Sequence, residues 1–193
     1  MARRRGIDRD DVIEAALTIV DRDGLDALSL KAVADALDVQ SPSLYSHVDG
    51  LSGLLDALAL AVTAEFGEIL RDSVVGVAGD DAVAAFAHAY RDWATTRPGR
   101  YELSLRRVAR ADKRAAGRSA IETMDRVLAS FGLVGAEATA AGRTLRAALH
   151  GFSTLEAADA LGRGRHDESF DYLVRHFLRG VRVGAAEPFG QVT

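Results

Sequence analysis

The chain of 193 residues contains no cysteine, which excludes disulfides, thiolate catalysis and cysteine-based zinc or iron–sulfur sites. Proline is rare, with three residues, and no alternation of apolar and polar residues lasts long enough to indicate a strand. Charges interrupt the apolar-rich stretches, which argues against a membrane span. The basic start, MARRRGIDRDD, has no apolar stretch after it and is not a signal peptide. These absences predict an all-α, cytoplasmic protein.

Positive charge is scarce at the N-terminus. Residues 1–50 hold six basic and ten acidic residues, and the whole chain has a formal net charge of −4. This balance excludes a uniformly basic nucleic-acid-binding face. Some of the acids have a structural reason, since Asp8 is placed as a helix N-cap and Asp10 and Asp11 fall in the first turn. Any contact with nucleic acid therefore depends on where the charges lie.

One short window, VQSPSLYSHV at residues 39–48, contains no acid. Ser29 is placed to cap a short helix before it. Ser41 is predicted to cap a third, very short helix with Pro42 at its first position. Two short helices joined by a tight turn fit a helix-turn-helix, whose second helix brings small residues close to base edges and phosphates.

The rest of the chain shows the apolar spacing of longer helices. The pattern predicts a long helix from Leu51 that Gly76 and Gly79 break. Further helices are predicted over residues 80–97, 101–108, 112–131, 136–161 and 167–183. We expect a helix-turn-helix domain at 1–50, a second helical domain at 51–185, and a loose tail at 186–193.

The stretch LSLKAVADALDVQSPSLYSHVDGLSGLLDAL resembles the DNA-binding region of the tetracycline-repressor (TetR) family of bacterial transcriptional regulators, through its Pro-x-Leu-Tyr-x-His core. The resemblance implies that Leu44 packs inward. It implies a DNA-facing set comprising Lys31, Gln40, Ser41, Pro42, Ser43, Tyr45, Ser46 and His47.

Two positions depart from the family's pattern. Asp38 stands in the turn where many members have glycine, and aspartate tolerates left-handed backbone better than most residues. Leu51 stands where members usually carry a lysine that contacts phosphate. Arg3, Arg4 and Arg5 are candidates for a flexible arm that compensates for the missing lysine.

The stretches HAYRDWATTRPGRYELSL and ALHGFSTLEAADAL resemble the C-terminal domain of one TetR subgroup, which has a Trp/Leu-His-Gly signature. Here Leu149-His150-Gly151 fills that place. The resemblance implies a domain that binds a small effector and forms a homodimer through its last two helices.

Candidates for an effector site are six aromatic residues, one methionine and one histidine after the helix-turn-helix: Phe66, Phe86, Tyr90, Trp93, Tyr101, Met124, His150 and Phe152. Ordinary core packing is the alternative for each of them. The histidines do not have metal-ligand spacing, so we expect no metal and no cofactor. The basic run RRVARADKRAAGR is interpreted as a solvated helix face, with DNA or an acidic effector as alternatives.

The sequence therefore predicts a ligand-responsive, DNA-binding transcriptional regulator, a repressor that a small-molecule effector releases from its operator. A helical small-molecule-binding or scaffolding protein with weak or lost DNA binding is the alternative. An all-α enzyme is disfavoured because no acid/base pair, catalytic triad or phosphate loop is present.

Overall fold

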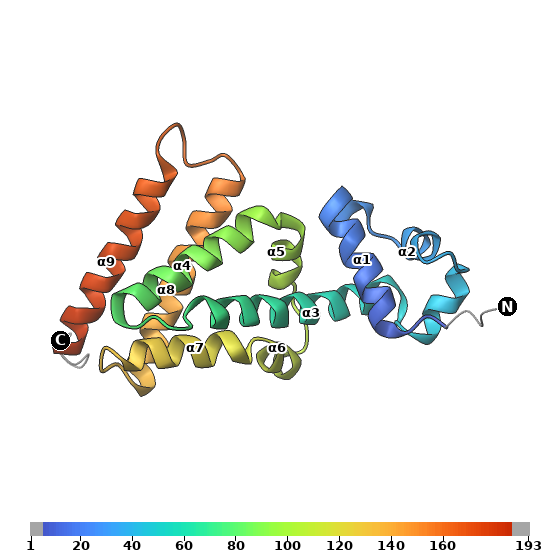
Figure 1. The fold of residues 1–193 in the computed structure, drawn as a ribbon. Coiled ribbons are helices and arrows are strands. Elements are labelled where there is room, and N and C mark those ends of the chain that lie inside the picture. Colours follow the sequence, from blue (N-terminus) through green and yellow to red (C-terminus); the bar gives the residue numbers. More distant parts are fainter. Residues whose placement is uncertain (1–5, 187–193) are drawn as a thin grey trace. The chain divides into compact units, whose positions relative to one another are not determined.

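The predicted all-α class is confirmed: the computed structural model describes residues 6–186, and in that range the chain forms helices and turns without a β-strand (Figure 1). The elements are α1 (Arg9–Asp23), η1 (Leu25–Ala27), α2 (Leu30–Ala36), η2 (Ser41–Ser46), α3 (Gly50–Ser73), α4 (Gly79–Thr96), α5 (Pro98–Leu105), α6 (Arg110–Ala116), α7 (Arg118–Ala129), α8 (Gly135–Ala157) and α9 (His166–Ala186). The proposed arm at Arg3–Arg5 and residues 187–193 of the predicted tail lie outside the described residues.

The chain packs as two compact units. The first contains the chain up to Thr63 together with Arg97–Ala116, and the second contains Ala64–Thr96 and the chain from Gly117 onward. Helix α3 therefore contributes to both units, and α5 and α6 pack with the N-terminal helices. The expected division at residue 50 stays a prediction.

The first unit begins with a reciprocal cap on α1. Asp11 donates its backbone N–H to Asp8 Oδ1 at 2.9 Å, and Asp8 donates its own to Asp11 Oδ2 at 2.8 Å. Such a capping box satisfies two N–H groups that the helix leaves free. The core of the unit consists of apolar side chains from four helical segments, among them Val12, Ala16, Val20, Val33, Leu44, Leu54 and Leu58. The acids at the start of α1 are thus explained by helix capping.

Helix α5 joins the first unit through a close approach to α1. A Cβ atom at Gly99 would lie 2.7 Å from Cγ1 of Val20, so only glycine fits at this position. Next to it, the Arg100 guanidinium donates to both oxygens of Asp21, with Nη2 at 2.6 Å from Oδ2. Arg106 pairs with Asp56 on α3 at 2.7 Å. One glycine contact and two ion pairs therefore hold this distant segment against the N-terminal helices.

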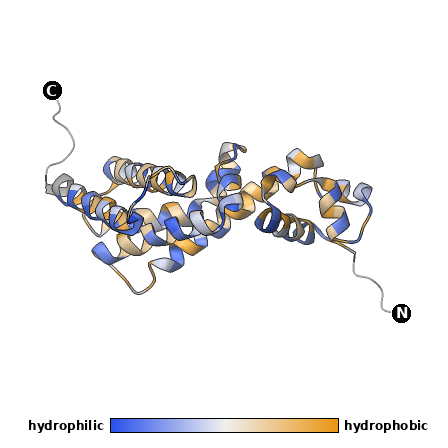
Figure 2. Cartoon of the chain, turned by 90° about the horizontal axis from the view of Figure 1, so that it is seen from above, coloured by the Kyte–Doolittle hydropathy of each residue, from blue (hydrophilic) through white to orange (hydrophobic). Residues whose placement is uncertain are grey.

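The second unit is built from amphipathic helices around a core that includes Trp93, Leu128, Leu145, Leu149 and Phe170. Figure 2 shows hydrophobic and hydrophilic residues on different sides of many helices of the chain. The single helix predicted over residues 112–131 is wrong, because the backbone leaves helical geometry at Gly117 and starts again as α7. The helix predicted over 136–161 ends at Ala157, since Asp159 adopts a left-handed conformation with φ 52°.

A half-buried arginine connects three helices of the second unit. Arg91 on α4 donates from Nε to Oε2 of Glu156 on α8 at 2.7 Å, and a second bond joins Nη2 to Oε1. Its Nη1 lies 2.8 Å from Oδ1 of Asp167 on α9. The guanidinium also lies over the rings of Phe170 and Phe152, at 4.9 and 5.6 Å from their centroids. This network holds the pKa of Glu156 below its usual value, chiefly through the hydrogen bond from Arg91.

The lowered pKa of Glu156 gives the stability of the protein an acid-dependent part. A carboxyl whose pKa is lower in the folded chain stabilises it at pH above the unfolded value, and this stabilisation disappears as pH falls through the folded value. We expect Glu156→Gln to reduce the free energy of unfolding by about 2 kcal/mol at neutral pH. The difference from the wild type should shrink below about pH 4.

Urea denaturation at neutral and acid pH measures this difference. Glu102→Gln is the matched control, because Glu102 is an exposed glutamate of the first unit and should change little at either pH. A difference between Glu156→Gln and the wild type that stays the same at acid pH would contradict the role of the ion pair.

Candidate nucleic-acid interface

The turn between α2 and η2 is tight and depends on one left-handed residue. Ser29 caps α2 as predicted, its Oγ accepting from the backbone N–H of Ala32 at 3.1 Å. The chain then reverses through Asp38, whose φ is 53°, and Val39 donates its backbone N–H to the Ala34 carbonyl at 3.0 Å. Asp38 therefore adopts the left-handed conformation that glycine usually adopts in turns at the ends of helices.

The second helix of the motif, η2, is a short 3₁₀-helix with Pro42 in its first turn. The predicted cap at Ser41 is wrong. Gln40 occupies the cap position without a side-chain hydrogen bond to the helix, and Ser41 is already the first helical residue. At the other end of the helix, Ser46 Oγ donates to the Ser43 carbonyl at 2.8 Å. The side chain of Gln40 is therefore not used in capping.

Burial divides the segment 39–48 into an inner and an outer side. Leu44 is 0% exposed and Val48 is 6% exposed, so both belong to the core of the first unit. Tyr45, by contrast, is 62% exposed. Among the other predicted DNA-facing residues, those fully at the surface are Lys31, Gln40, Pro42, Ser43 and Ser46, and those half-buried are Ser41 and His47. The outer side thus gathers hydroxyl, amide, phenol and imidazole groups without an acid.

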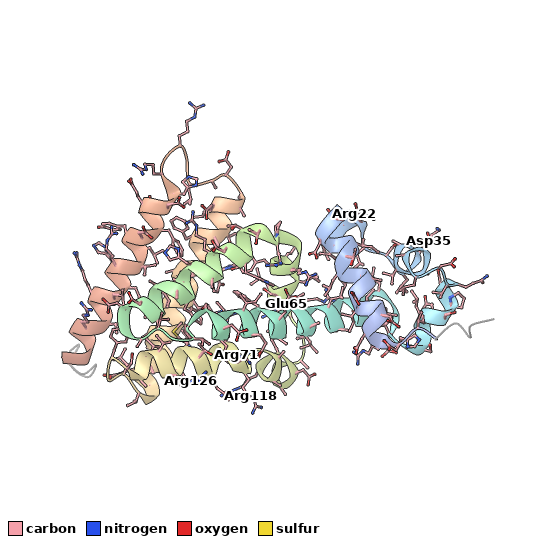
Figure 3. The ribbon with its side chains drawn as sticks, in the orientation of Figure 1. Arg22, Asp35, Glu65, Arg71, Arg118 and Arg126 are labelled. Atoms are coloured by element: carbon pink, nitrogen blue, oxygen red, sulfur yellow. The ribbon has the colours of Figure 1, made fainter. Side chains whose placement is uncertain are left out.

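Lys31 on α2 forms an ion pair with Asp35, with Nζ 2.6 Å from Oδ2 (Figure 3 labels Asp35). The side chains are 80% and 63% exposed. Exposed pairs of this kind contribute at most about 1 kcal/mol. Lys31 can therefore exchange Asp35 for a phosphate at little cost.

The first unit contains more positive charge than the N-terminal residues alone suggest. Its N-terminal stretch, up to Thr63, has six basic and eleven acidic residues, whereas residues 97–116 have seven basic and two acidic ones. With the residues of α5 and α6 included, the numbers of basic and acidic residues in the first unit are balanced. The exposed arginines Arg107 and Arg114 come from the run interpreted above as a solvated face, and local periodicity could not place that run in the same unit as the helix-turn-helix.

The residues proposed for an effector site are only partly brought together. Phe66 stacks on Trp93 with centroids 4.3 Å apart and an interplanar angle of 12°, and it meets the Tyr90 ring edge-on at 5.0 Å. Trp93 also donates from Nε1 to Glu65 Oε1 at 3.4 Å (Glu65 is labelled in Figure 3). These residues of α3 and α4 form one aromatic stack: Phe66, Tyr90 and Trp93.

The remaining candidates lie elsewhere. Phe152 packs against Phe170 at 5.1 Å, beside Arg91. Thr154 Oγ1 lies 3.4 Å from Nδ1 of His150. Phe86 and Met124 are buried on α4 and α7, and Met124 Cγ lies 3.3 Å from where a Cβ of Gly142 would stand. Tyr101 belongs to α5 and hence to the first unit.

Two polar residues of the second unit, Glu65 and Ser153, were not among the candidates predicted from the sequence. Glu65 lies next to Phe66 in the chain, and an acid between two apolar residues was the signal that the sequence offered. Ser153 is buried at the third position of the series Leu145, Leu149, Ser153, whose four-residue spacing on α8 was also readable. No local pattern distinguishes such a serine from an ordinary small core residue.

Two further findings concern the part of the chain that the structure describes. No group of three or more histidine, aspartate or glutamate residues there could hold a metal ion. Across the same residues, no helix combines the length and the apolar character that a membrane crossing requires.

Comparison with known proteins agrees with this architecture. Residues 83–177 match the family model of the tetracyclin repressor-like C-terminal domain. An uncharacterized HTH-type transcriptional regulator of Mycobacterium tuberculosis is 36% identical over 184 residues, which cover 94% of this chain and 84% of that protein. A similarly described protein of Bacillus subtilis is 33% identical over 186 residues, which cover 95% and 97%.

The fold is also similar to solved structures. ActR, a TetR family protein of Streptomyces coelicolor in complex with (S)-DNPA, has a TM-score of 0.71 and 20% identity over 94% of this chain and 100% of ActR. The helical fold and the helix-turn-helix define a DNA-binding regulator of transcription. The chain belongs to the TetR family of such regulators.

The left-handed turn of the motif predicts an order of stabilities. At Asp38, we expect the Asp38→Gly protein to be more stable than Asp38→Ala by about 1 kcal/mol, because alanine is strained at positive φ. At Asp35, inside α2, the order should reverse by about the same amount. Thermal and urea unfolding of the four variants measures both differences, and the same order at both positions would contradict the assigned turn.

Proposed function

We propose that the protein is a homodimeric repressor that binds a pseudo-palindromic operator through the segment 39–48 and leaves it when a small-molecule effector binds in the second unit. The observation that carries the proposal is the acid-free outer side of that segment, held outward by the burial of Leu44. Its place of action is then the cytoplasm. The division of labour corresponds to the expected domains, 1–50 for DNA and 51–185 for effector and dimer contacts.

Each predicted DNA-facing residue has a chemical role in this proposal. Gln40, whose carboxamide is not used in capping, suits the N7 and N6 groups of an adenine. Tyr45 and His47 donate to phosphate oxygens, and Lys31 binds a neighbouring phosphate. The small residues Ser41, Pro42 and Ser43 allow the backbone to approach the groove closely.

The second unit supplies a candidate dimer surface on α8 and α9. Tyr172, His176 and Gly180 follow one another at four-residue spacing on α9, and all three are exposed. The Tyr172 ring is 58% exposed and stacks on His176 with centroids 3.7 Å apart. On α8, Leu155 is 47% exposed. A two-fold axis would pair this surface with itself and would place two recognition helices on half-sites about one DNA turn apart.

The aromatic stack and the residues around it are the proposed effector site. ActR, a protein of the same fold, is described in complex with (S)-DNPA, which supports the proposal that a chain with this fold binds an effector. Leu149-His150-Gly151 supports membership of the Trp/Leu-His-Gly subgroup. An effector that binds better to the conformation unsuited to DNA lowers the affinity for the operator, and DNA lowers the affinity for the effector by the same factor.

A second candidate function is a helical small-molecule-binding or scaffolding protein with weak or lost DNA binding. The acidic balance of residues 1–50 favours it, as does the leucine at position 51, which is 40% exposed. A mobility-shift titration with the DNA that flanks the gene separates the two functions. Tight, salt-dependent and sequence-selective binding supports the repressor. Binding no better than that to random DNA at low salt would leave only the second candidate.

Tyr45→Phe tests the role of the phenol in DNA binding. Losing one hydrogen bond to a phosphate should weaken binding by about 1 kcal/mol. Because the side chain is exposed, the thermal unfolding midpoint should not change. Fluorescence anisotropy with the operator measures the affinity. Equal affinity in a variant that is folded like the wild type would show that the hydroxyl makes no such contact.

Gly180→Glu tests the dimer surface. A Cβ at Gly180 meets nothing within 4 Å in the protomer, so a glutamate there should not disturb the fold. A charge buried between two copies is strongly unfavourable, and we expect monomers in sedimentation velocity. Gly164→Glu is the control, since Gly164 lies between α8 and α9 with equally open space. A dimer that persists in the Gly180→Glu variant would place the interface elsewhere.

A further inference from the structure

The first unit contains a cavity whose walls come from both of its stretches of sequence. Its volume is about 600 Å³, within the range of about 300–1,000 Å³ that is typical of small-molecule sites. The ten residues that line it all belong to the first unit, and they come from η1, from the start of α3 and from the end of α5 with the residues next to them. Packing of residues 97–116 on the N-terminal helices therefore creates this cavity.

Six leucines form the apolar part of the cavity. In order of increasing exposure, from the floor of the cavity to its rim, they are Leu103, Leu28, Leu25, Leu55, Leu51 and Leu105. Leu103 is 1% exposed, whereas Leu51 and Leu105 are 40% and 46% exposed. Exposed leucines around a cavity are unfavourable in water, and an apolar molecule bound there would cover them.

The charged groups that line the cavity do not balance. Arg106 donates from Nε to Oδ1 of Asp56 at 2.7 Å, so its charge is already compensated. Asp26, Glu102 and Arg107 are exposed, and none of them has an ion pair or a side-chain hydrogen bond with another described residue. Two carboxylates and one guanidinium therefore remain uncompensated at the rim, which gives it a net charge of −1.

We propose that this cavity is a small-molecule site and that its ligand is a lipophilic cation, an apolar molecule with one protonated amine. The leucines cover the apolar body of the ligand, and the ammonium group lies at the rim with the carboxylate of Asp26 or Glu102. A neutral ligand of the same shape would lack this attraction, and an anionic ligand would meet two like charges.

This site is separate from the effector site proposed in the second unit, and it does not depend on the proposed function. A ligand in the cavity contacts both stretches of the first unit, so it binds only when they are packed together. Leu51, at the rim, is three residues after Val48, the last residue of the segment 39–48. The ligand therefore stabilises directly the unit that contains the helix-turn-helix.

A second cavity of the first unit is the alternative place for a cation. Its volume is about 470 Å³, and Asp10 and Glu14 of α1 line it together with Arg100, which binds Asp21. Three of its lining residues are apolar, against six leucines in the first cavity. Because apolar burial provides most of the binding free energy of a lipophilic molecule, we assign the ligand to the first cavity.

Three probes that share a biphenyl group separate the ligand classes: biphenylmethylamine, biphenylmethanol and biphenylcarboxylate, which are cationic, neutral and anionic at neutral pH. Isothermal titration calorimetry with the full chain measures their affinities. We expect saturable binding of the amine, weaker binding of the alcohol and the weakest binding of the carboxylate. The amine should bind about 2- to 5-fold more tightly than the alcohol, which is the effect of one exposed ion pair.

Glu102→Gln and Glu14→Gln distinguish the two cavities. Both variants remove one exposed carboxylate, so the fold should not change. Glu102→Gln should weaken binding of the amine about 2- to 5-fold and leave binding of the alcohol unchanged. Glu14→Gln is the matched control, because Glu14 lines the other cavity, and it should leave both affinities unchanged.

Leu105→Ser tests the apolar part of the site. Loss of apolar contact should weaken binding of the amine and of the alcohol alike, by about 3- to 10-fold. Ile121→Ser is the matched control, because Ile121 is also 46% exposed but lies on α7, in the second unit. It should leave both affinities unchanged.

The inference is overturned if no probe binds in a saturable way, if the carboxylate binds as tightly as the amine, or if Leu105→Ser binds the amine like the wild type. Weaker binding of the amine to Glu14→Gln but not to Glu102→Gln would also overturn it, because the cation would then occupy the other cavity. None of these measurements involves DNA. Loss of operator binding with intact binding of the amine would count against the repressor alone.

Discussion

The burial of Leu44 is the constraint on which the orientation of the segment 39–48 depends. Leu44 has no exposed surface, and Val48, four residues later, is almost as deeply buried. In so short a segment, two buried anchors on one side determine where the other side chains point. Because Leu44 and Val48 occupy the buried side, Tyr45 and its polar neighbours face outward. The left-handed turn at Asp38 leads the chain into this segment. Apolar packing thus orients a surface whose own chemistry is polar.

In the first unit, tertiary contacts determine which acidic side chains are paired with basic ones. The N-terminal stretch is acidic, yet five of its eleven acids cap α1, pair with Lys31 on the surface or bind arginines from α5 and the residue that follows it. Arg100 and Arg106 neutralise Asp21 and Asp56 while other basic residues of the same segment stay exposed. A count of charges along the sequence therefore underestimates how favourable the folded unit is for a polyanion.

The sequence predicted much of this architecture because helix caps and apolar spacing are local signals. Asp8 and Ser29 were predicted as helix caps from residues within a turn of them, whereas the inward Leu44 was implied by the family resemblance. The failures have equally local causes: one glycine divides α6 from α7, and a 3₁₀-helix leaves Ser41 without a capping role. The docking of α5 and the cavity that it lines could not be predicted, because both depend on contacts between residues far apart in the chain. For the same reason, Tyr101 was grouped with aromatic residues of the other unit.

The first unit is assembled from two separate stretches of sequence, and this limits its modularity. A fragment that ends at Thr63 would lack the glycine that packs on Val20 and both arginines that bind Asp21 and Asp56. Exchanging recognition domains between regulators at a single junction would create the same defect. A functional chimera therefore needs two junctions, so that Arg97–Ala116 travels with the helices it holds. In this protein, the part of the chain that we propose to bind the effector carries within its own sequence a piece of the unit that contains the helix-turn-helix.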